Sequence, residues 1–78
     1  MKHIPQFYTA IKKTKHNAFP VIYDRFYSYP NNARIVWCES NNHLVGKSYR
    51  QSDLWCKKKL NAQTLEEAIK EAALMSLQ

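Results

Sequence analysis

Apolar positions near the N-terminus repeat with the period of a helix. The spacing i, i+3, i+4, i+7, which is typical of one helical face, is occupied by Ile4, Phe7, Tyr8 and Ile11. Pro5 suits a first helical turn, where its missing N–H costs no hydrogen bond. The pattern therefore predicts a short helix over residues 5–15. An isolated helix of this length is marginal in water, so we expect it to dock on another element.

The middle of the chain is rich in aromatic and β-branched residues, which favour strands. Residues 19–29 and 33–40 are interpreted as two strands, separated by a Pro-Asn-Asn turn signal at residues 30–32. The two asparagines at residues 41–42 tolerate the positive φ that a two-residue hairpin turn requires. A third strand is predicted to follow over residues 43–50.

This hairpin predicts a register for the second and third strands. Its cross-strand pairs on one face are Cys38 with Val45, Val36 with Lys47, and Arg34 with Tyr49. On the other face Trp37 lies opposite Gly46, with Ile35 and Leu44 nearby, and an aromatic ring across a strand glycine is a compensating pair. Because this second face is the more apolar one, we expect it to face the core.

Residues 53–60 fit a fourth strand or an extended loop better than a helix, although the segment is ambiguous. As a regular strand it would place Leu54, Cys56 and Leu60 on one face and Trp55, Lys57 and Lys59 on the other.

Residues 64–77 give a clear helical pattern: Thr64 and Glu67 have the spacing of a capping box. Ala68 and Ala72 are small enough to let this helix approach a sheet closely. The predicted fold class is α+β over a single domain, residues 1–78. It combines a three- or four-stranded antiparallel sheet with a C-terminal helix on one face and a short N-terminal helix, in the order α-β-β-β-(β)-α.

Composition adds a polarised charge to this picture. The 78 residues contain 12 Lys and Arg against 6 Asp and Glu, which gives a formal net charge of +6. Residues 64–78 carry three Glu and one Lys, whereas residues 1–63 carry 11 of the basic side chains and 3 of the acidic ones. The excess of positive charge therefore lies outside the C-terminal helix.

Several classes of protein do not fit the sequence. A single glycine excludes a Gly-rich phosphate loop, and two cysteines are too few for a disulfide framework. Lysines at positions 12, 13 and 15 interrupt any signal sequence, and no stretch reaches the length of a membrane span. The histidines and cysteines have no zinc-ligand spacing. We therefore expect a cytoplasmic protein that is not an enzyme, with no catalytic residue, metal or cofactor and no membrane partner.

Basic residues interleaved with aromatic ones are the candidate binding site, because this combination suits phosphates together with bases or sugars. The candidate residues are Arg34, Lys47, Tyr49, Arg50, Trp55, Lys57, Lys58, Lys59, Lys12 and Lys13. The leading hypothesis is a small nucleic-acid-binding accessory protein, for DNA or RNA, that uses the sheet face and the lysine run. The alternative is a protein-binding regulator or inhibitor, of the kind that a phage or other mobile element encodes, that masks an acidic or nucleic-acid-binding surface of a partner protein.

Both hypotheses leave structural alternatives open. The lysines at 57–59 also fit a solvated edge strand that blocks aggregation, and Trp55 also fits a core position. A narrow sheet has free edges, so the chain is expected to be a monomer or a dimer formed through a sheet edge.

The predicted order of elements resembles that of the double-stranded-RNA-binding domain, in which two helices flank three strands. In that family a basic cluster at the start of the last helix meets phosphates, whereas this sequence has Thr64, Leu65, Glu66 and Glu67 there. The order is also similar to the sheet-plus-helix module of the integrase arm-binding kind. That resemblance implies DNA contact through the sheet face, and so through Arg34, Lys47 and Tyr49. We assign the chain to neither family, because similarity of fold does not establish function.

Overall fold

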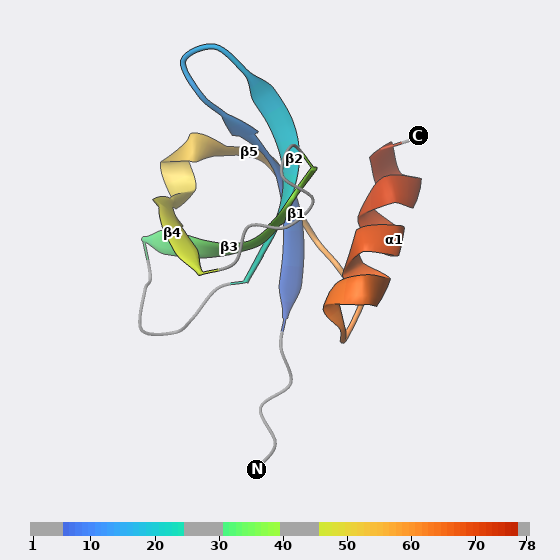
Figure 1. Cartoon of the computed structure of the whole chain (residues 1–78). Coiled ribbons are helices and arrows are strands. Elements are labelled where there is room, and N and C mark those ends of the chain that lie inside the picture. Colours follow the sequence, from blue (N-terminus) through green and yellow to red (C-terminus); the bar gives the residue numbers. More distant parts are fainter. Residues whose placement is uncertain (1–5, 25–30, 40–45, 77–78) are drawn as a thin grey trace.

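The computed structural model describes residues 6–24, 31–39 and 46–76. Its elements, in chain order, are β1 (Phe7–Lys13), β2 (Ala18–Asp24), β3 (Asn32–Cys38), β4 (Lys47–Arg50), the 3-10 turn η2 (Gln51–Asp53), β5 (Leu54–Lys59) and α1 (Leu65–Ser76). The five strands form one sheet in the order β4-β3-β2-β1-β5, and each neighbouring pair is antiparallel. The expected α+β character and the C-terminal helix are confirmed (Figure 1).

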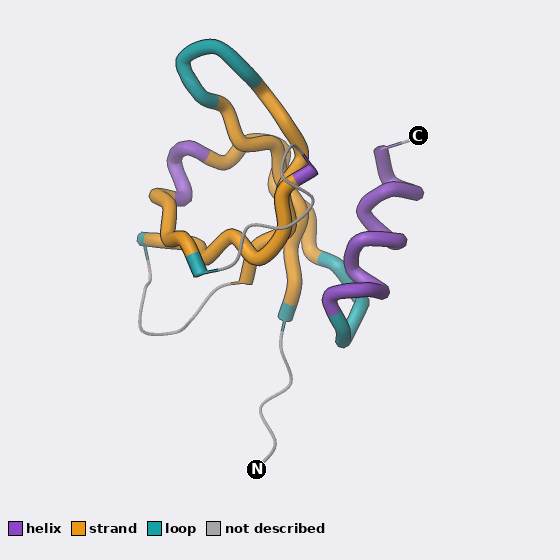
Figure 2. The backbone as a smooth tube through the Cα atoms, in the orientation of Figure 1, coloured by secondary structure: helices purple, strands orange, loops and turns teal. Residues whose placement is uncertain are grey.

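The sheet is strongly curved, and its two edge strands, β4 and β5, are joined by η2 (Figure 2). β1 and β4 are separated by β2 and β3 in the sheet. Nevertheless the Nζ of Lys12 on β1 lies 4.2 Å from the ring centroid of Tyr49 on β4. Contact between side chains of such distant strands requires the sheet to curl, so it approaches a closed barrel.

The N-terminal helix predicted over residues 5–15 is wrong, because Phe7–Lys13 is strand β1. β1 pairs with both β2 and β5 and has apolar contacts on both of its faces. Phe7 packs in the cluster beneath α1, while Tyr8 and Ala10 pack in the cluster inside the curved sheet. A strand buried on both faces loses the alternation of apolar and polar residues, which explains why its residues imitate a helical period.

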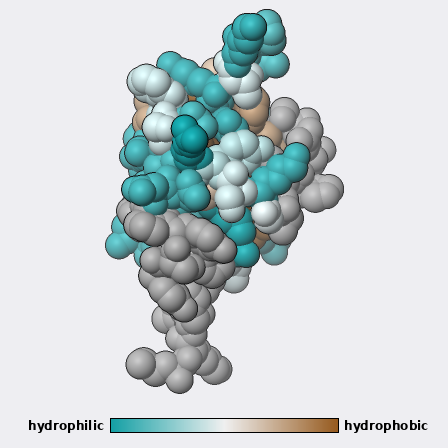
Figure 3. Space-filling view, turned by 90° about the vertical axis from the view of Figure 1, so that its left-hand side faces the viewer, coloured by the Kyte–Doolittle hydropathy of each residue, from teal (hydrophilic) through white to brown (hydrophobic). Residues whose placement is uncertain are grey.

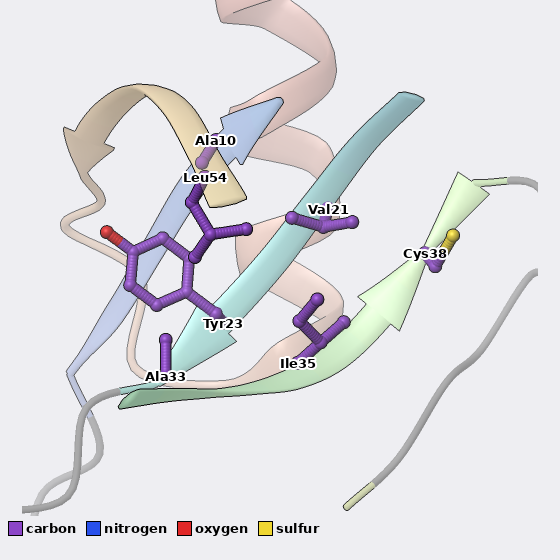
Figure 4. Close-up of a cluster of buried hydrophobic side chains, with 7 residues drawn as sticks. All are labelled: Ala10, Val21, Tyr23, Ala33, Ile35, Cys38 and Leu54. Atoms are coloured by element: carbon purple, nitrogen blue, oxygen red, sulfur yellow. The ribbon is translucent and has the colours of Figure 1, made fainter. Parts of the chain in front are cut away.

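Side chains on the concave face of the sheet form one of two buried clusters (Figure 4). Its members are Ala10, Val21, Tyr23, Ala33, Ile35, Cys38 and Leu54. Tyr8 stacks on Tyr23 with ring centroids 5.2 Å apart. This interior is closed by side chains from all five strands, because Tyr49 of β4 also packs against it.

The convex face carries the second cluster, which α1 covers (Figure 1). Its buried members are Phe7, Ile22, Val36, Leu60, Ala62 and Ala68. The helix begins as its sequence predicts, because the Thr64 hydroxyl accepts a hydrogen bond from the Glu67 N–H at 3.2 Å. The Glu71 carboxylate accepts hydrogen bonds from the backbone N–H groups of Asn61 and Ala62 at 3.0 Å, which fastens the preceding segment to the helix.

The predicted hairpin register is wrong by one residue. The structure pairs Ile35 with Lys47 and Ala33 with Tyr49, where the prediction gave Val36 and Arg34 as the partners. β4 begins at Lys47, after Gly46 at φ 85, so the predicted pairing of Trp37 with Gly46 is not made. The turn at residues 41–42, the segment 43–45 and the end of the first predicted strand, 25–29, lie outside the described residues.

Residues 53–60, for which a strand or an extended loop was favoured over a helix, contain β5, which is an edge strand. The sheet therefore has five strands where three or four were expected, because the segment predicted as a helix supplies the additional one.

We predict that Leu60→Ala destabilises the protein by about 2–5 kcal/mol, because Leu60 has no exposed surface and its truncation leaves a cavity beneath α1. Urea unfolding followed by circular dichroism measures the change. Leu74→Ala is the matched control, since Leu74 is 65% exposed and should change stability by no more than about 0.5 kcal/mol. Equal losses in the two variants would contradict the placement of Leu60.

Candidate functional site

An irregularity in the pairing of β1 with β5 sets the arrangement of the candidate lysines. The register pairs Ile11 with Trp55 and Thr9 with Lys58, so that two residues, Cys56 and Lys57, stand opposite Ala10. This is a β-bulge, which inserts one extra residue and reverses the alternation beyond it. Thr9 and Ile11 point to the convex face, and their partners Lys58 and Trp55 therefore share that face.

The bulge corrects the predicted faces of the 53–60 segment. Leu54 packs in the concave cluster and Leu60 in the convex one, whereas an uninterrupted strand would have placed both on one face. Lys58 shares the face of Trp55, and Lys59 lies opposite Tyr8 on the other face. The three consecutive lysines are thus divided between the two faces and the bulge.

Cys56 adopts a left-handed backbone conformation, with φ 56. It is the one residue with positive φ other than glycine in the described ranges, and such a conformation costs an ordinary residue about 1–2 kcal/mol. Its thiol side chain is exposed, whereas Cys38 is buried in the concave cluster. Glycine or asparagine would be the usual signal for this bulge, so nothing in the sequence at position 56 pointed to it.

Lys13 completes a row with Trp55 and Lys58 on the convex face. The Nζ of Lys13 lies 4.4 Å from the centroid of the Trp55 ring, a cation–π contact between β1 and β5. Trp55 keeps 51% of its surface exposed, so it is not a core residue. We call Lys13, Trp55 and Lys58 the outer row. These three residues of the predicted site share one face at the β1–β5 edge.

The other predicted site residues are distributed elsewhere. Lys12 is only 8% exposed and its ammonium lies over the Tyr49 ring at the mouth of the curved sheet. Arg34 forms an ion pair with Asp24, with hydrogen bonds of 3.2 Å from Nε to Oδ1 and 2.6 Å from Nη2 to Oδ2. Sequence reasoning missed Asp24 as the partner of Arg34, because the two meet only through the pairing of β2 with β3.

Lys47 and Arg50 are exposed on the edge strand β4. Viewed from the side of β4 and η2, the described surface is mainly hydrophilic (Figure 3). A shallow polar hollow of about 320 Å³ lies here, lined by Asn31, Asn32, Arg50, Gln51 and Ser52. This surface is polar but lacks an exposed Trp, in contrast to the outer row.

A cavity of about 340 Å³ lies between the convex face and the C-terminal half of α1. Ile11, Pro20, Trp37, Ile69 and Met75 contribute apolar walls to it. Lys58, Cys56 and Glu39 also line the cavity, so Lys58 is the member of the outer row that borders it.

In the described part of the chain, no group of three or more His, Cys, Asp or Glu side chains could hold a metal ion. Among the same residues, no helix has the length and apolar character needed to cross a membrane.

Comparison with known proteins provides no relative. No protein-family model matches the chain, and neither a curated protein nor a solved structure is significantly similar to it. The predicted order of elements, which resembled that of the double-stranded-RNA-binding domain, is also wrong. The chain has strand β1 where that order requires its first helix. The function must therefore be inferred from the residues of the site alone.

We predict that Cys56→Gly leaves the free energy of unfolding unchanged or raises it by up to about 1 kcal/mol, because glycine adopts positive φ without a steric cost. Cys56→Val should lower it by about 1–2 kcal/mol, because a β-branched residue resists this conformation. Thermal unfolding of both variants measures the difference.

The same two substitutions at Ser48 provide the matched control, since Ser48 is exposed in β4 and has no positive φ. The Ser48→Val variant should be at least as stable as Ser48→Gly, because strands favour β-branched residues. The bulge geometry is contradicted if Val is preferred over Gly at position 56 as well.

Proposed function

We propose that the protein is a small nucleic-acid-binding protein whose contact surface is the edge of the sheet formed by β5 and the adjoining end of β1. The observation that carries this proposal is the outer row, in which an exposed Trp lies between two lysines on one face. Lysines supply the electrostatic attraction to phosphates, and an exposed aromatic ring supplies a surface for bases or sugars.

The distribution of charge supports the same surface. Lys57, Lys58 and Lys59 are all exposed, so β5 concentrates three positive charges along its length, which the bulge divides between the two faces. Two acidic side chains of α1 accept hydrogen bonds from the segment before the helix: Glu71 from the backbone N–H groups of Asn61 and Ala62, and Glu67 from the Gln63 N–H at 3.4 Å. An anionic polymer is therefore attracted to β5 and repelled by the first turn of α1.

The broad sheet faces are less suited to this role than the edge. The concave face closes over its own buried cluster, and α1 covers much of the convex face. Arg34, which a sheet-face site would use, is held by Asp24. These contacts move the proposed surface from the sheet face to the β5 edge and the adjoining end of β1.

The test is binding of fluorescently labelled DNA and RNA, followed by anisotropy from about 50 to 200 mM salt. The affinity should fall steeply as salt rises, because bound phosphates release counterions. Replacing Lys57, Lys58 and Lys59 together with Gln should weaken binding and reduce the slope of log K against log salt by about 0.7 or more, the value for at least one lost phosphate contact. If no nucleic acid binds at the lowest salt concentration, the proposal is wrong.

A triple variant of Lys15, Lys47 and Lys70 to Gln is the matched control. It removes the same charge from three exposed lysines that lie in the β1–β2 connection, on β4 and on α1. The proposal requires the β5 variant to lose more affinity than this control, with both retaining the thermal unfolding of the parent chain. Equal losses would show that net charge alone governs binding. Stoichiometric binding of an acidic protein, with no binding of nucleic acid, would favour the regulator hypothesis.

A further inference from the structure

We propose that the outer row selects single-stranded nucleic acid, with an unpaired base stacked on Trp55 and the adjacent phosphates held by Lys13 and Lys58. This inference rests on the proposed function and names the class of strand that the same surface takes.

The exposure of Trp55 is the first observation behind this inference. Among the described large apolar residues, Trp55 and Leu74 are the exposed ones, at 51% and 65%. Trp55 lies on β5, an edge strand of the described sheet. The ammonium of Lys13 lies over one face of the indole, 4.4 Å from the ring centroid, so a base that stacks on Trp55 takes the opposite face while Lys13 attracts phosphate.

Stacking on a tryptophan requires a base whose face is free. Bases inside a duplex stack on one another, whereas the bases of a single strand can leave the stack and lie on an aromatic side chain. Reading a duplex usually places a helix or a two-stranded ribbon in the major groove. The described helix, α1, instead packs its apolar face on the sheet and carries Glu66 and Glu67 in its first turn. Trp55 therefore favours a single strand over a duplex.

The spacing of the row suits one nucleotide unit between two cations. Lys58 lies at the level of Thr9, Trp55 at the level of Ile11, and Lys13 two residues further along β1. Two residues of a strand span about 7 Å, so the Trp backbone position lies about 7 Å from that of each lysine along the strand direction. A base can thus occupy the centre of the row while the phosphate of the nucleic acid on either side of it contacts a lysine.

The β-bulge determines which lysine belongs to the row. Beyond the bulge the register pairs Lys58 with Thr9, whereas Lys57 lies within the bulge opposite Ala10. Lys57 and Lys58 have the same charge and are both exposed. If the loss of Lys58 weakens binding more than the loss of Lys57, the difference is therefore caused by the register and not by the charge.

The experiment compares labelled oligo-dT and oligo-rU of about 12 nucleotides with a DNA duplex of the same length, at about 50 mM salt. The full-length chain should bind the single strands about tenfold or more tightly than the duplex. Trp55→Ala should weaken single-strand binding by about 5- to 150-fold, which corresponds to the loss of one stacked base. Trp55→Phe should retain most of the affinity, because it preserves an aromatic face. Leu74→Ala is the matched control and should leave binding unchanged.

Two single lysine variants test the row itself. Lys58→Gln should reduce the salt slope by about 0.7, the value for one phosphate contact on a single strand, and Lys57→Gln should change it less. Circular-dichroism melting of each variant shows that it is folded. Trp55→Phe and the lysine variants keep the test decisive if Trp55→Ala unfolds.

The outcomes separate this inference from the function on which it rests. If the duplex binds as tightly as the single strands and Trp55→Ala has no effect, the single-strand inference is overturned and nucleic-acid binding stands. Equal losses for Lys57→Gln and Lys58→Gln overturn the role of the row. If no oligonucleotide binds, both the inference and the proposed function are overturned.

Discussion

The burial of β1 on both of its faces is the constraint on which the rest of the structure depends. A chain of 78 residues has little apolar surface to bury, and here one curved sheet supports two clusters. β1 contributes Tyr8 and Ala10 to the concave cluster and Phe7 to the convex one. It also pairs with β2 and β5, and the pairing with β1 is what makes β5 part of the sheet. The position of the lysine run follows from this pairing.

The same burial explains which elements could be predicted from the sequence. The helix at Leu65–Ser76 is encoded locally, because Thr64 caps it and its apolar stripe faces a single neighbour. The strand at Phe7–Lys13 is specified by contacts with distant strands, so its own pattern gave no reliable period. The hairpin register failed for a related reason. The two asparagines suggested a turn length, but Ala33, Ile35 and Tyr49 all pack in the concave cluster, which fits the observed pairing of Ala33 with Tyr49.

Composition predicted the kind of site, whereas the fold determined its members. Lys12 and Lys13 are adjacent in sequence, yet one is buried against Tyr49 and the other lies over Trp55, because successive residues of a strand point to opposite faces. Arg34 could not be excluded from the sequence, since its neutralisation by Asp24 arises from pairing between β2 and β3. The membership of the outer row likewise depends on cross-strand neighbours.

The strained conformation of Cys56 connects the stability of the fold with the proposed site. An uninterrupted β5 would direct Leu54 and Leu60 to the same face, and the second cluster would lack a side chain that is fully buried. The bulge gives one leucine to each cluster. Burial of a leucine contributes about 1.5–3 kcal/mol, which offsets the cost of about 1–2 kcal/mol for a left-handed residue other than glycine. The bulge reverses the alternation of faces along the strand, so it both buries Leu60 and places Lys58 on the same face as Trp55. The geometry of the outer row is thus a consequence of core packing, to which the contact between Lys13 and Trp55 is added.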